Sequence, residues 1–187
     1  MQIISILSIS NVSIKRLQEL LVCLLCRNMA PEIIMLTIDL RPMTADDLDA
    51  VLLIEQASFP APWNRDHFLH EIAALHSYPH VAQLDDRLAG YVCLMSLFEE
   101  AQILDIAVAP DQRGRGIALA LMECAIGLAV EKGAELLALE VRSTNIAAIK
   151  LYERLGFERV GIRSRYYEGV DDAVLMEKNL KCDCLSR

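Results

Sequence analysis

The sequence has little positive charge and lacks an apolar run long enough to cross a membrane. Its 18 lysine and arginine residues are outnumbered by 26 aspartate and glutamate residues, and the formal net charge is −8. Nucleic-acid binding requires a basic face, so this balance argues against a nucleic-acid partner. The apolar run Leu20–Cys26 is too short to span a bilayer, and Lys15 and Arg16 interrupt the segment before it, unlike in a signal peptide. We therefore expect a cytoplasmic protein with no membrane span.

Metal-binding patterns are also missing. Nothing indicates secretion, so we expect reduced thiols rather than disulfides from the six cysteines. Two cysteines lie in apolar runs typical of a core, and the four near the chain ends include a C-x-C spacing that is poor for zinc. No carboxylate or cysteine pattern accompanies the histidines. We expect no metal site among these residues: Cys23, Cys26, Cys93, Cys124, Cys182, Cys184, His67, His70, His76 and His80.

Length and composition fit a single domain with short flanking segments. A chain of 187 residues with 54% hydrophobic content can bury one sizeable core. We assign residues 1–34 to an N-terminal extension, residues 35–180 to the domain and residues 181–187 to a C-terminal tail. Two interpretations of the extension stay open. It is either an amphipathic helix over Ser13–Arg27 that anchors the protein to a partner or a membrane surface, or a segment outside the native domain, with Met29 or Met35 as the natural start.

Hydrophobic periodicity and turn residues predict a mixed α/β domain with helices on both faces of one sheet. A capping-box pattern starts at Thr44, Asn64 can cap a second helix, and Gly156 can end the last one. The expected strands are Leu36–Arg41, His80–Leu84, Leu88–Leu97, Glu100–Val108, Leu136–Val141, Phe157–Arg163 and Ala173–Lys178. The expected helices run from Thr44 to about Ala57, from Asn64 onward, from Ile117 to about Lys132, and from Asn145 to Leu155.

The stretch Ile103–Met122 predicts a strand, a glycine-rich loop and a helix. Pro110 stops the strand, and two glycines, Gly114 and Gly116, leave the loop amides accessible before the helix begins. Exposed amides at a helix N-terminus form an anion site, and a pyrophosphate is the anion we expect. The sequence has no Gly-Lys-Ser/Thr triplet of a P-loop. It also lacks the third small residue of a dinucleotide fingerprint, and antiparallel strands precede the loop.

The pattern Arg113-x-x-Gly116-x-Ala118 resembles the acyl-CoA loop of the GNAT superfamily of N-acetyltransferases. The later stretch Leu139–Phe157, with Asn145 and Tyr152-Glu-Arg-Leu-Gly-Phe157, resembles a second motif of that superfamily. Further stretches, Glu55–Trp63 and Arg165-Tyr-Tyr167 among them, are similar to the RimI-type enzymes, which acetylate the N-terminal alanine of a small-subunit ribosomal protein. The resemblance covers about Leu36 to Lys178. It implies the GNAT fold, with a mostly antiparallel central sheet.

The resemblance also implies that acetyl-CoA is the donor substrate, without a metal. Backbone amides of the loop would hold the pyrophosphate, and the strand before it would pair with the pantetheine arm, with the Val108 amide as a donor to the thioester oxygen. Asn145 matches a family CoA contact and is also a plausible helix N-cap. The expected donor-binding residues are Ile106, Ala107, Val108, Arg113, Gly114, Arg115, Gly116, Ile117, Ala118, Leu119 and Asn145.

Glu140 and Tyr152 are the catalytic candidates. Glu140 ends an apolar run, where partial burial would make its carboxylate a stronger base. The alternative for Glu140 is a structural ion pair with Arg142 or Arg163. Tyr152 can give a proton to the departing thiolate, or it can simply pack in the core. The resemblance favours the catalytic alternatives, because the matching residues in the family are assigned as proton acceptor and proton donor.

For the acceptor we expect a ribosomal protein N-terminus held by aromatic side chains. An α-amine titrates near 7.7–8.0, so it needs less help from a base than a lysine. Phe59, Trp63 and Tyr166 are the candidate substrate-binding residues, and plain packing is an equally open interpretation of these aromatics. Two other functions also stay open: acetylation of a lysine, polyamine or small amine, and a non-catalytic CoA-binding interaction module.

Overall fold

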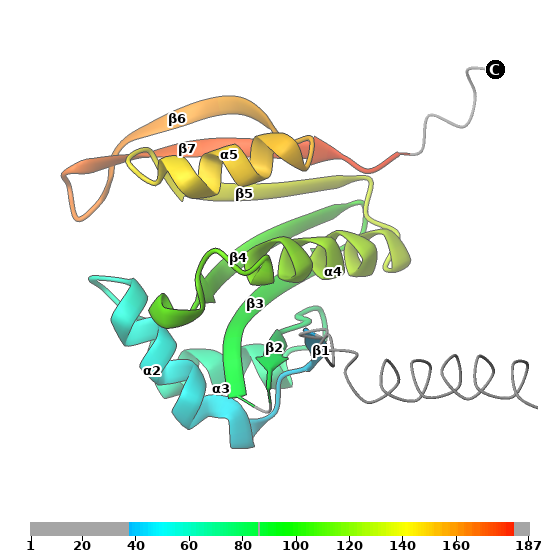
Figure 1. The fold of residues 1–187 in the computed structure, drawn as a ribbon. Coiled ribbons are helices and arrows are strands. Elements are labelled where there is room, and N and C mark those ends of the chain that lie inside the picture. The colour runs from blue at the N-terminus through cyan, green and yellow to red at the C-terminus, as the bar shows by residue number, and fades with distance from the viewer. Residues whose placement is uncertain (1–37, 86, 182–187) are drawn as a thin grey trace, which may run out of the picture. The chain divides into compact units, whose positions relative to one another are not determined.

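One sheet of seven strands organises the described part of the chain (Figure 1). The structure, a computed structural model, describes residues 38–85 and 87–181. Its strand order is β1-β2-β3-β4-β5-β7-β6. The strands are β1 (Asp39–Pro42), β2 (His80–Leu84), β3 (Arg87–Leu97), β4 (Glu100–Val108), β5 (Leu136–Arg142), β6 (Glu158–Tyr167) and β7 (Asp171–Asn179). The helices are α2 (Leu48–Ser58), α3 (Arg65–Ala73), α4 (Ile117–Glu131) and α5 (Ile146–Arg154), with short 3-10 turns η1 (Ala45–Asp47) and η2 (Pro110–Gln112).

The strands β4 and β5 form a parallel pair, whereas the other neighbouring strands run antiparallel. This parallel pairing covers only four registers and ends where Ile103 meets Leu139. Beyond that point β4 continues to Val108 and β5 to Arg142 without pairing to each other. The two strands diverge toward the end of the domain that carries the β6–β7 turn (Figure 1). The sheet therefore has an opening in its middle, which we call the β4–β5 opening.

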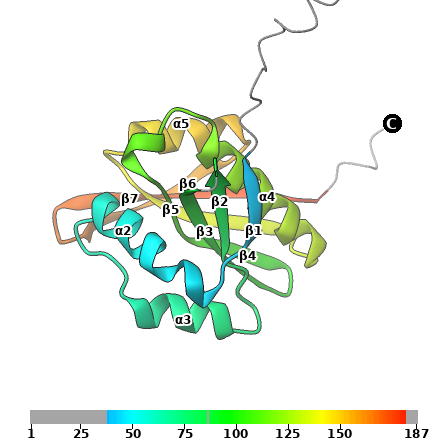
Figure 2. The same cartoon turned by 60° about the horizontal axis from the view of Figure 1, so that its bottom comes forward.

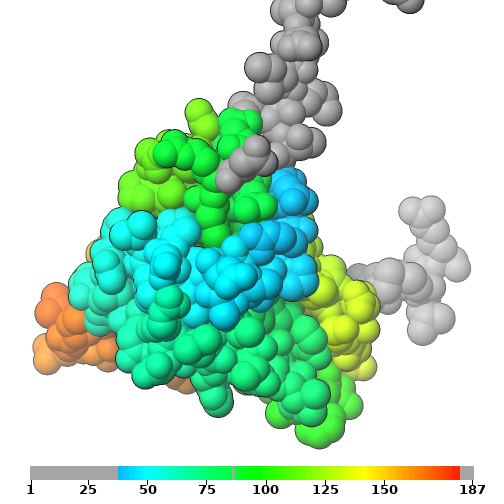
Figure 3. Space-filling model, turned by 90° about the horizontal axis from the view of Figure 1, so that it is seen from below, coloured from blue at the N-terminus to red at the C-terminus, as the bar shows by residue number. Residues whose placement is uncertain are grey.

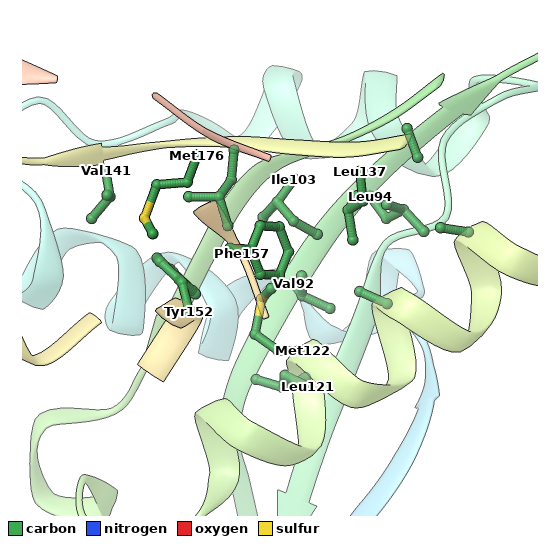
Figure 4. Close-up of a cluster of buried hydrophobic side chains, with 14 of the residues drawn as sticks. Val92, Leu94, Ile103, Leu121, Met122, Leu137, Val141, Tyr152, Phe157 and Met176 are labelled. Carbon is green, nitrogen blue, oxygen red and sulfur yellow. The ribbon is translucent and has the colours of Figure 1, made fainter. Parts of the chain in front are cut away.

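Two helical layers cover the sheet. Alternate residues of β3 face opposite sides: Val92 belongs to the core cluster with α4 and α5, and Tyr91 to the cluster with α2 and α3. Figure 2 shows the sheet between these two layers, and Figure 4 shows the larger cluster, where Leu121 and Met122 of α4 lie beneath the sheet. Seen from below relative to Figure 1, α2 and α3 form the centre of the visible face, and the orange end of β6–β7 projects beyond them (Figure 3).

Gly90 brings α4 against the sheet. A Cβ atom at this position would lie 2.8 Å from the Ala107 carbonyl oxygen and 3.1 Å from Cδ1 of Leu121. Real Cβ atoms do not come so close to a backbone oxygen, so any side chain at residue 90 would displace β4 and would also crowd the α4 side chains. Gly90 thus allows β4 and α4 to pack closely around this point of β3.

The expected fold class is confirmed, and most element bounds agree with the prediction to within one or two residues. Asn64 caps α3 as expected, since its Oδ1 accepts from the His67 amide at 3.0 Å. The capping box at Thr44 is present, but it opens the turn η1 before α2. The predicted end of β6 was wrong. The strand runs to Tyr167 rather than ending at Arg163, because it resumes its pairing with β7 after a register shift.

Several expectations concern residues outside the described ranges. These are the N-terminal extension, residues 182–187 of the C-terminal tail, and the four cysteines Cys23, Cys26, Cys182 and Cys184. Between residues 38 and 181, where the structure is described, no helix is long and apolar enough to cross a membrane. The same residues contain no group of three or more histidine, cysteine, aspartate or glutamate side chains arranged to hold a metal ion.

Candidate active site

The end of β4 that does not pair with β5 presents backbone groups to the β4–β5 opening. The Ala109 amide donates to the Ala89 carbonyl at 2.9 Å, and residues of an antiparallel strand alternate in the direction of their N–H and C=O groups. The backbone groups of Ile106 and Val108 therefore point away from β3. Because β5 does not pair beyond Leu139, these groups face the opening. They form a short strand edge that an extended ligand can join.

The loop after β4 adds a row of free amides. Gly114 and Gly116 have φ values of 78° and 83°, a left-handed conformation that glycine adopts without strain. Gly116 is the N-cap of α4 and provides no side-chain cap, and the first turn contains no acidic residue. The first amides of a helix have no intrahelical acceptor, so this terminus is free to bind an anion. The buried Ile117 anchors the turn in the core.

A cavity of about 670 Å³ joins these two features, between the end of β4, the loop and the face of α5. The size is within the range of small-molecule binding sites. The structure brings nearly all of the predicted donor-binding residues together here. Ten of the eleven line the cavity, and the exception is Arg115, whose Nη1 instead donates to Gln112 Oε1 at 2.8 Å. The ten are Ile106, Ala107, Val108, Arg113, Gly114, Gly116, Ile117, Ala118, Leu119 and Asn145.

Arg113 links three elements around this cavity. Its Nε donates to the Val108 carbonyl at 3.2 Å, and one Nη donates to Ser58 Oγ at 3.3 Å. Ser58 is the last residue of α2, and both it and Arg113 line the cavity. The guanidinium group thus connects the loop to the end of β4 and to α2. Its position holds the strand edge as well as adding positive charge beside the free amides.

The helix α5 supplies the opposite wall. Asn145 serves as its N-cap, because Oδ1 accepts from the Ala148 amide at 3.2 Å, and the same residue lines the cavity. Both expected roles of Asn145 are therefore compatible in one conformation. The wall continues along one side of α5 through small residues, Ala147 and Ala148, which leave room for a ligand beside the strand edge.

Tyr152 closes this wall and is nearly fully buried. Its exposed fraction is 6%, and its ring lies 5.9 Å from the ring of Phe157. Burial raises the pKa of Tyr152, and the neighbouring Tyr167 and Asp105 raise it further. A phenol with a raised pKa stays protonated near neutral pH, so Tyr152 contributes a neutral hydroxyl group at the cavity wall. It also packs in the core, so the two interpretations of Tyr152 are not exclusive.

Glu140 lies on the other face of the sheet and does not line the cavity. Its neighbours in β5, Leu139 and Val141, belong to the core on the α4–α5 side, so the Glu140 side chain points to the α2–α3 side. Glu140 Oε1 is 2.7 Å from an Arg163 Nη, and the carboxylate side chain is 18% exposed. Of the two ion pairs considered from the sequence, the one with Arg163 is present. Arg142 instead pairs with Glu168 and Asp171.

The acceptor candidates occupy three different environments. Phe59 lines the cavity, whereas Trp63 packs 5.4 Å from the Phe68 ring on the α2–α3 side. Tyr166 is 52% exposed and makes an edge contact with Tyr167 at 5.1 Å. Phe59 therefore lies at the cavity, and Tyr166 lies at the β6–β7 end of the domain. Trp63 is mainly a packing residue.

Sequence reasoning missed a buried polar group beside this site. The Tyr91 hydroxyl contacts the carboxylates of both Glu55 and Asp105. Two signals were present in the sequence. Glu55 follows Val51 by four residues, on the apolar face of α2, and Asp105 interrupts the apolar strand β4. A carboxylate at such a position is an exception to the usual burial pattern and indicates a paired or functional group.

Comparisons with known proteins agree with the geometry. Residues 48–157 match the family described as the acetyltransferase (GNAT) family. A relative from Bacillus subtilis is 40% identical over 139 residues, 73% of this chain and 91% of its own length. The [ribosomal protein bS18]-alanine N-acetyltransferase of Salmonella typhimurium is 36% identical over 137 residues, 72% of this chain and 92% of that protein.

A solved structure gives the same result. The crystal structure of the ribosomal-protein-S18-alanine N-acetyltransferase from Escherichia coli is similar with a TM-score of 0.72 and 30% identity, and the match covers 81% of this chain and all of that one. The GNAT resemblance of the loop and of the Leu139–Phe157 stretch is therefore confirmed. With its β4–β5 opening, its free strand edge and its amide-rich loop, this chain belongs to the GNAT family of acetyltransferases.

Proposed function

We propose that this chain transfers the acetyl group of acetyl-CoA to the α-amine of the N-terminal alanine of ribosomal protein bS18. The observation that carries the proposal is the cavity, which joins a free strand edge, a row of free amides and the Tyr152 hydroxyl. The names of the relatives from Salmonella typhimurium and Escherichia coli support alanine of this ribosomal protein as the acceptor. A cytoplasmic location follows from that acceptor.

The donor would bind along the cavity. The amides from Gly114 to Leu119 would hold its pyrophosphate, because that helix terminus has no competing cap or acidic residue. The pantetheine arm would join the β4 edge by hydrogen bonds to the backbone groups of Ile106 and Val108. The Val108 amide would then donate to the thioester oxygen and stabilise the negative charge that develops there.

Acetyl transfer then requires proton movements at two atoms. Glu140, on the far face of the sheet, would accept a proton from the attacking nitrogen. Tyr152, on the cavity side, would give a proton to the departing sulfur. The two groups approach from opposite faces, so the amine and the thioester would meet in the β4–β5 opening. Phe59 and Tyr166, beside that opening, would contact the acceptor peptide.

A transfer assay with defined acceptors tests the proposal. Purified full-length protein is mixed with acetyl-CoA and a peptide that has the bS18 N-terminus, beginning with alanine. We expect release of free CoA together with a mass increase of one acetyl group on the terminal residue. The matched control is the same peptide with its α-amine blocked and its lysines free. Acetylation that persists on the blocked peptide would instead support a lysine acceptor, and CoA binding without transfer to any amine would support a non-catalytic module.

A further inference from the structure

Three polar side chains meet on the α2–α3 side of the sheet, next to the β4–β5 opening. Glu55 of α2 and Tyr91 of β3 are 1% and 0% exposed. The Tyr91 hydroxyl contacts Glu55 Oε2 and lies 3.0 Å from Asp105 Oδ2. The remaining Glu55 oxygen accepts from the Trp63 amide at 2.7 Å. The mechanism described above uses none of these three side chains.

The group contains one proton fewer than its contacts require. A phenol has a single proton to donate, and here two carboxyl groups lie against its oxygen. The closer contact is to Glu55, so Tyr91 donates there. The contact with Asp105 is then favourable only when Asp105 itself carries a proton and donates it to the phenol oxygen. When Asp105 is ionised, its oxygen faces another lone pair and a second carboxylate nearby, so the site favours binding a proton.

Asp105 is placed at the opening. It follows the last β4–β5 pair, Ile103 with Leu139, by two residues. Its position opposite Cys93, together with the contact to Tyr91, puts it on the α2–α3 side, the same side as Glu140. Its charge also acts on Tyr152 at the cavity wall and on Tyr167 of β6, so it lies between the two halves of the site.

The titratable groups around Asp105 come from four other elements. The Tyr91 hydroxyl on β3 contacts both Asp105 and Glu55 of α2. The negative charge of Asp105 also raises the pKa values of Cys93 on β3, Tyr152 on α5 and Tyr167 on β6. The two tyrosines at the opening and Cys93 stay neutral near pH 7, because burial raises the pKa of each. Burial and the neighbouring Glu55 raise the pKa of Asp105 to about 7, against the lowering effects of Tyr91 and the Ile106 amide.

We propose that Asp105 takes the first proton from the acceptor α-ammonium group, and that Glu55, which accepts the Tyr91 hydroxyl proton, is a positioning residue that makes this proton binding favourable. The inference rests on the proposed function and deepens it. An α-amine is mostly an ammonium ion near pH 7, so its nitrogen must lose two protons before it becomes an amide nitrogen. The two carboxylates on the α2–α3 side, Asp105 and Glu140, supply one acceptor for each proton.

The steps balance. Asp105 carboxylate removes one proton from the ammonium group and gives a neutral amine, and the new carboxyl proton is donated to the Tyr91 oxygen. The amine forms a bond to the thioester carbon and loses its second proton to Glu140, while the carbon–sulfur bond breaks. The sulfur takes a proton from Tyr152. The products are an acetylated amine and CoA thiol, and one net proton returns to solvent when the side chains regain their starting states.

The first test compares kcat/KM between pH 6.5 and pH 9 for the wild type and Asp105→Asn, with the alanine peptide as acceptor. At pH 6.5 only about a twentieth of a free α-amine is neutral, and the variant lacks the carboxylate that removes the extra proton, so it should be roughly fivefold slower. At pH 9 the amine is already neutral, and the two enzymes should agree to within about twofold. Glu140→Gln should remain slow at both pH values. Equal loss in Asp105→Asn at both pH values, or no loss at either, would overturn the role.

A second measurement needs no acceptor. In protein labelled with ¹³C at the aspartate carboxyl carbons, the NMR signal absent from Asp105→Asn should titrate near pH 7 in the wild type. In Glu55→Gln the amide can donate to the Tyr91 oxygen, which turns the phenol proton toward Asp105, and the titration should move down by about one pH unit or more. A wild-type titration near pH 4 would overturn the inference and leave the proposed function intact. No acetylation of any α-amine peptide, with titration near pH 7, would overturn the proposed function and the proton-acceptor role with it.

Discussion

Replacing Gly90 with alanine is expected to destabilise the fold and to weaken donor binding together. The added Cβ would lie 2.8 Å from the Ala107 carbonyl oxygen, 3.1 Å from Leu121 Cδ1 and 3.3 Å from Ile117 Cγ2. Backbone or α4 must move by several tenths of an ångström to relieve this, at a cost of about 1–3 kcal/mol, partly offset by the lower entropy of alanine in the unfolded chain. Urea unfolding followed by circular dichroism should show a midpoint lower by about 0.5–1 M.

The consequence for binding follows from the same contacts. Ala107 and Ile117 both line the cavity, so a shift of either moves the strand edge relative to the free amides of α4. Calorimetric titration with CoA should give a higher Kd for Gly90→Ala than for the wild type. The matched control is Gly127→Ala in the exposed interior of α4, where a Cβ would meet nothing within 4 Å. That variant should be more stable by about 0.5–1 kcal/mol with unchanged CoA affinity. A Gly90→Ala protein as stable as the wild type, or destabilised with normal CoA binding, would refute this reasoning.

Three further predictions concern the site and its support. Tyr152→Phe should lower kcat by about a hundredfold in the peptide assay with CoA affinity retained. The control Tyr78→Phe, at the α4 end beside Lys132, should leave kcat unchanged. A kcat of Tyr152→Phe equal to that of the wild type would remove its role as proton donor. Arg113→Ala should raise the Kd for CoA by about fivefold and lower the free energy of unfolding by about 0.5–1.5 kcal/mol, because the hydrogen bonds to Val108 and Ser58 are lost; an unchanged Kd would contradict its role at the cavity. The ion pair with Arg41 lowers the pKa of Asp47 to about 2, so its contribution of about 1–2 kcal/mol to the free energy of unfolding should be present above pH 4 and be lost as the pH falls toward 2. The difference in stability between the wild type and Asp47→Asn, measured by urea unfolding, should shrink over that range. A constant difference would contradict the reasoning.

The donor side of the site could be predicted from the sequence because its signals are local. An apolar strand ended by Pro110, two glycines and an apolar helix lie within twenty residues, and the structure places them in one cavity. The bounds of β4 agree with the prediction because alternation and turn residues both mark them. The capping role of Asn145 could be predicted because capping depends on residues within one turn of helix, whereas its place at the cavity was implied by the family resemblance.

The acceptor side could not be predicted in the same way, because it depends on long-range register. Tyr91 lies 36 residues from Glu55 and 14 from Asp105, and only the pairing of β3 with β4 and the packing of α2 bring them together. A register shift after Cys93 leaves Leu104 unpaired, and this decides which face Asp105 occupies. A single sequence carries no marker for such a shift. The separation of Glu140 from the cavity likewise follows from the alternation of β5 in three dimensions.

The short β4–β5 pairing also has a consequence for cooperativity. Four parallel registers are the direct strand-to-strand connection between β1–β4 and β5–β7 in the described sheet. The amides of β5 beyond Leu139 lack a β4 partner, so sub-global opening should reach them at lower free energy than the amides of β3. A ligand held by both β4 and α5 would join the two parts. Native-state hydrogen exchange should then show its largest slowing in α5 and the end of β5 when CoA is added, rather than in the loop proposed to hold the pyrophosphate.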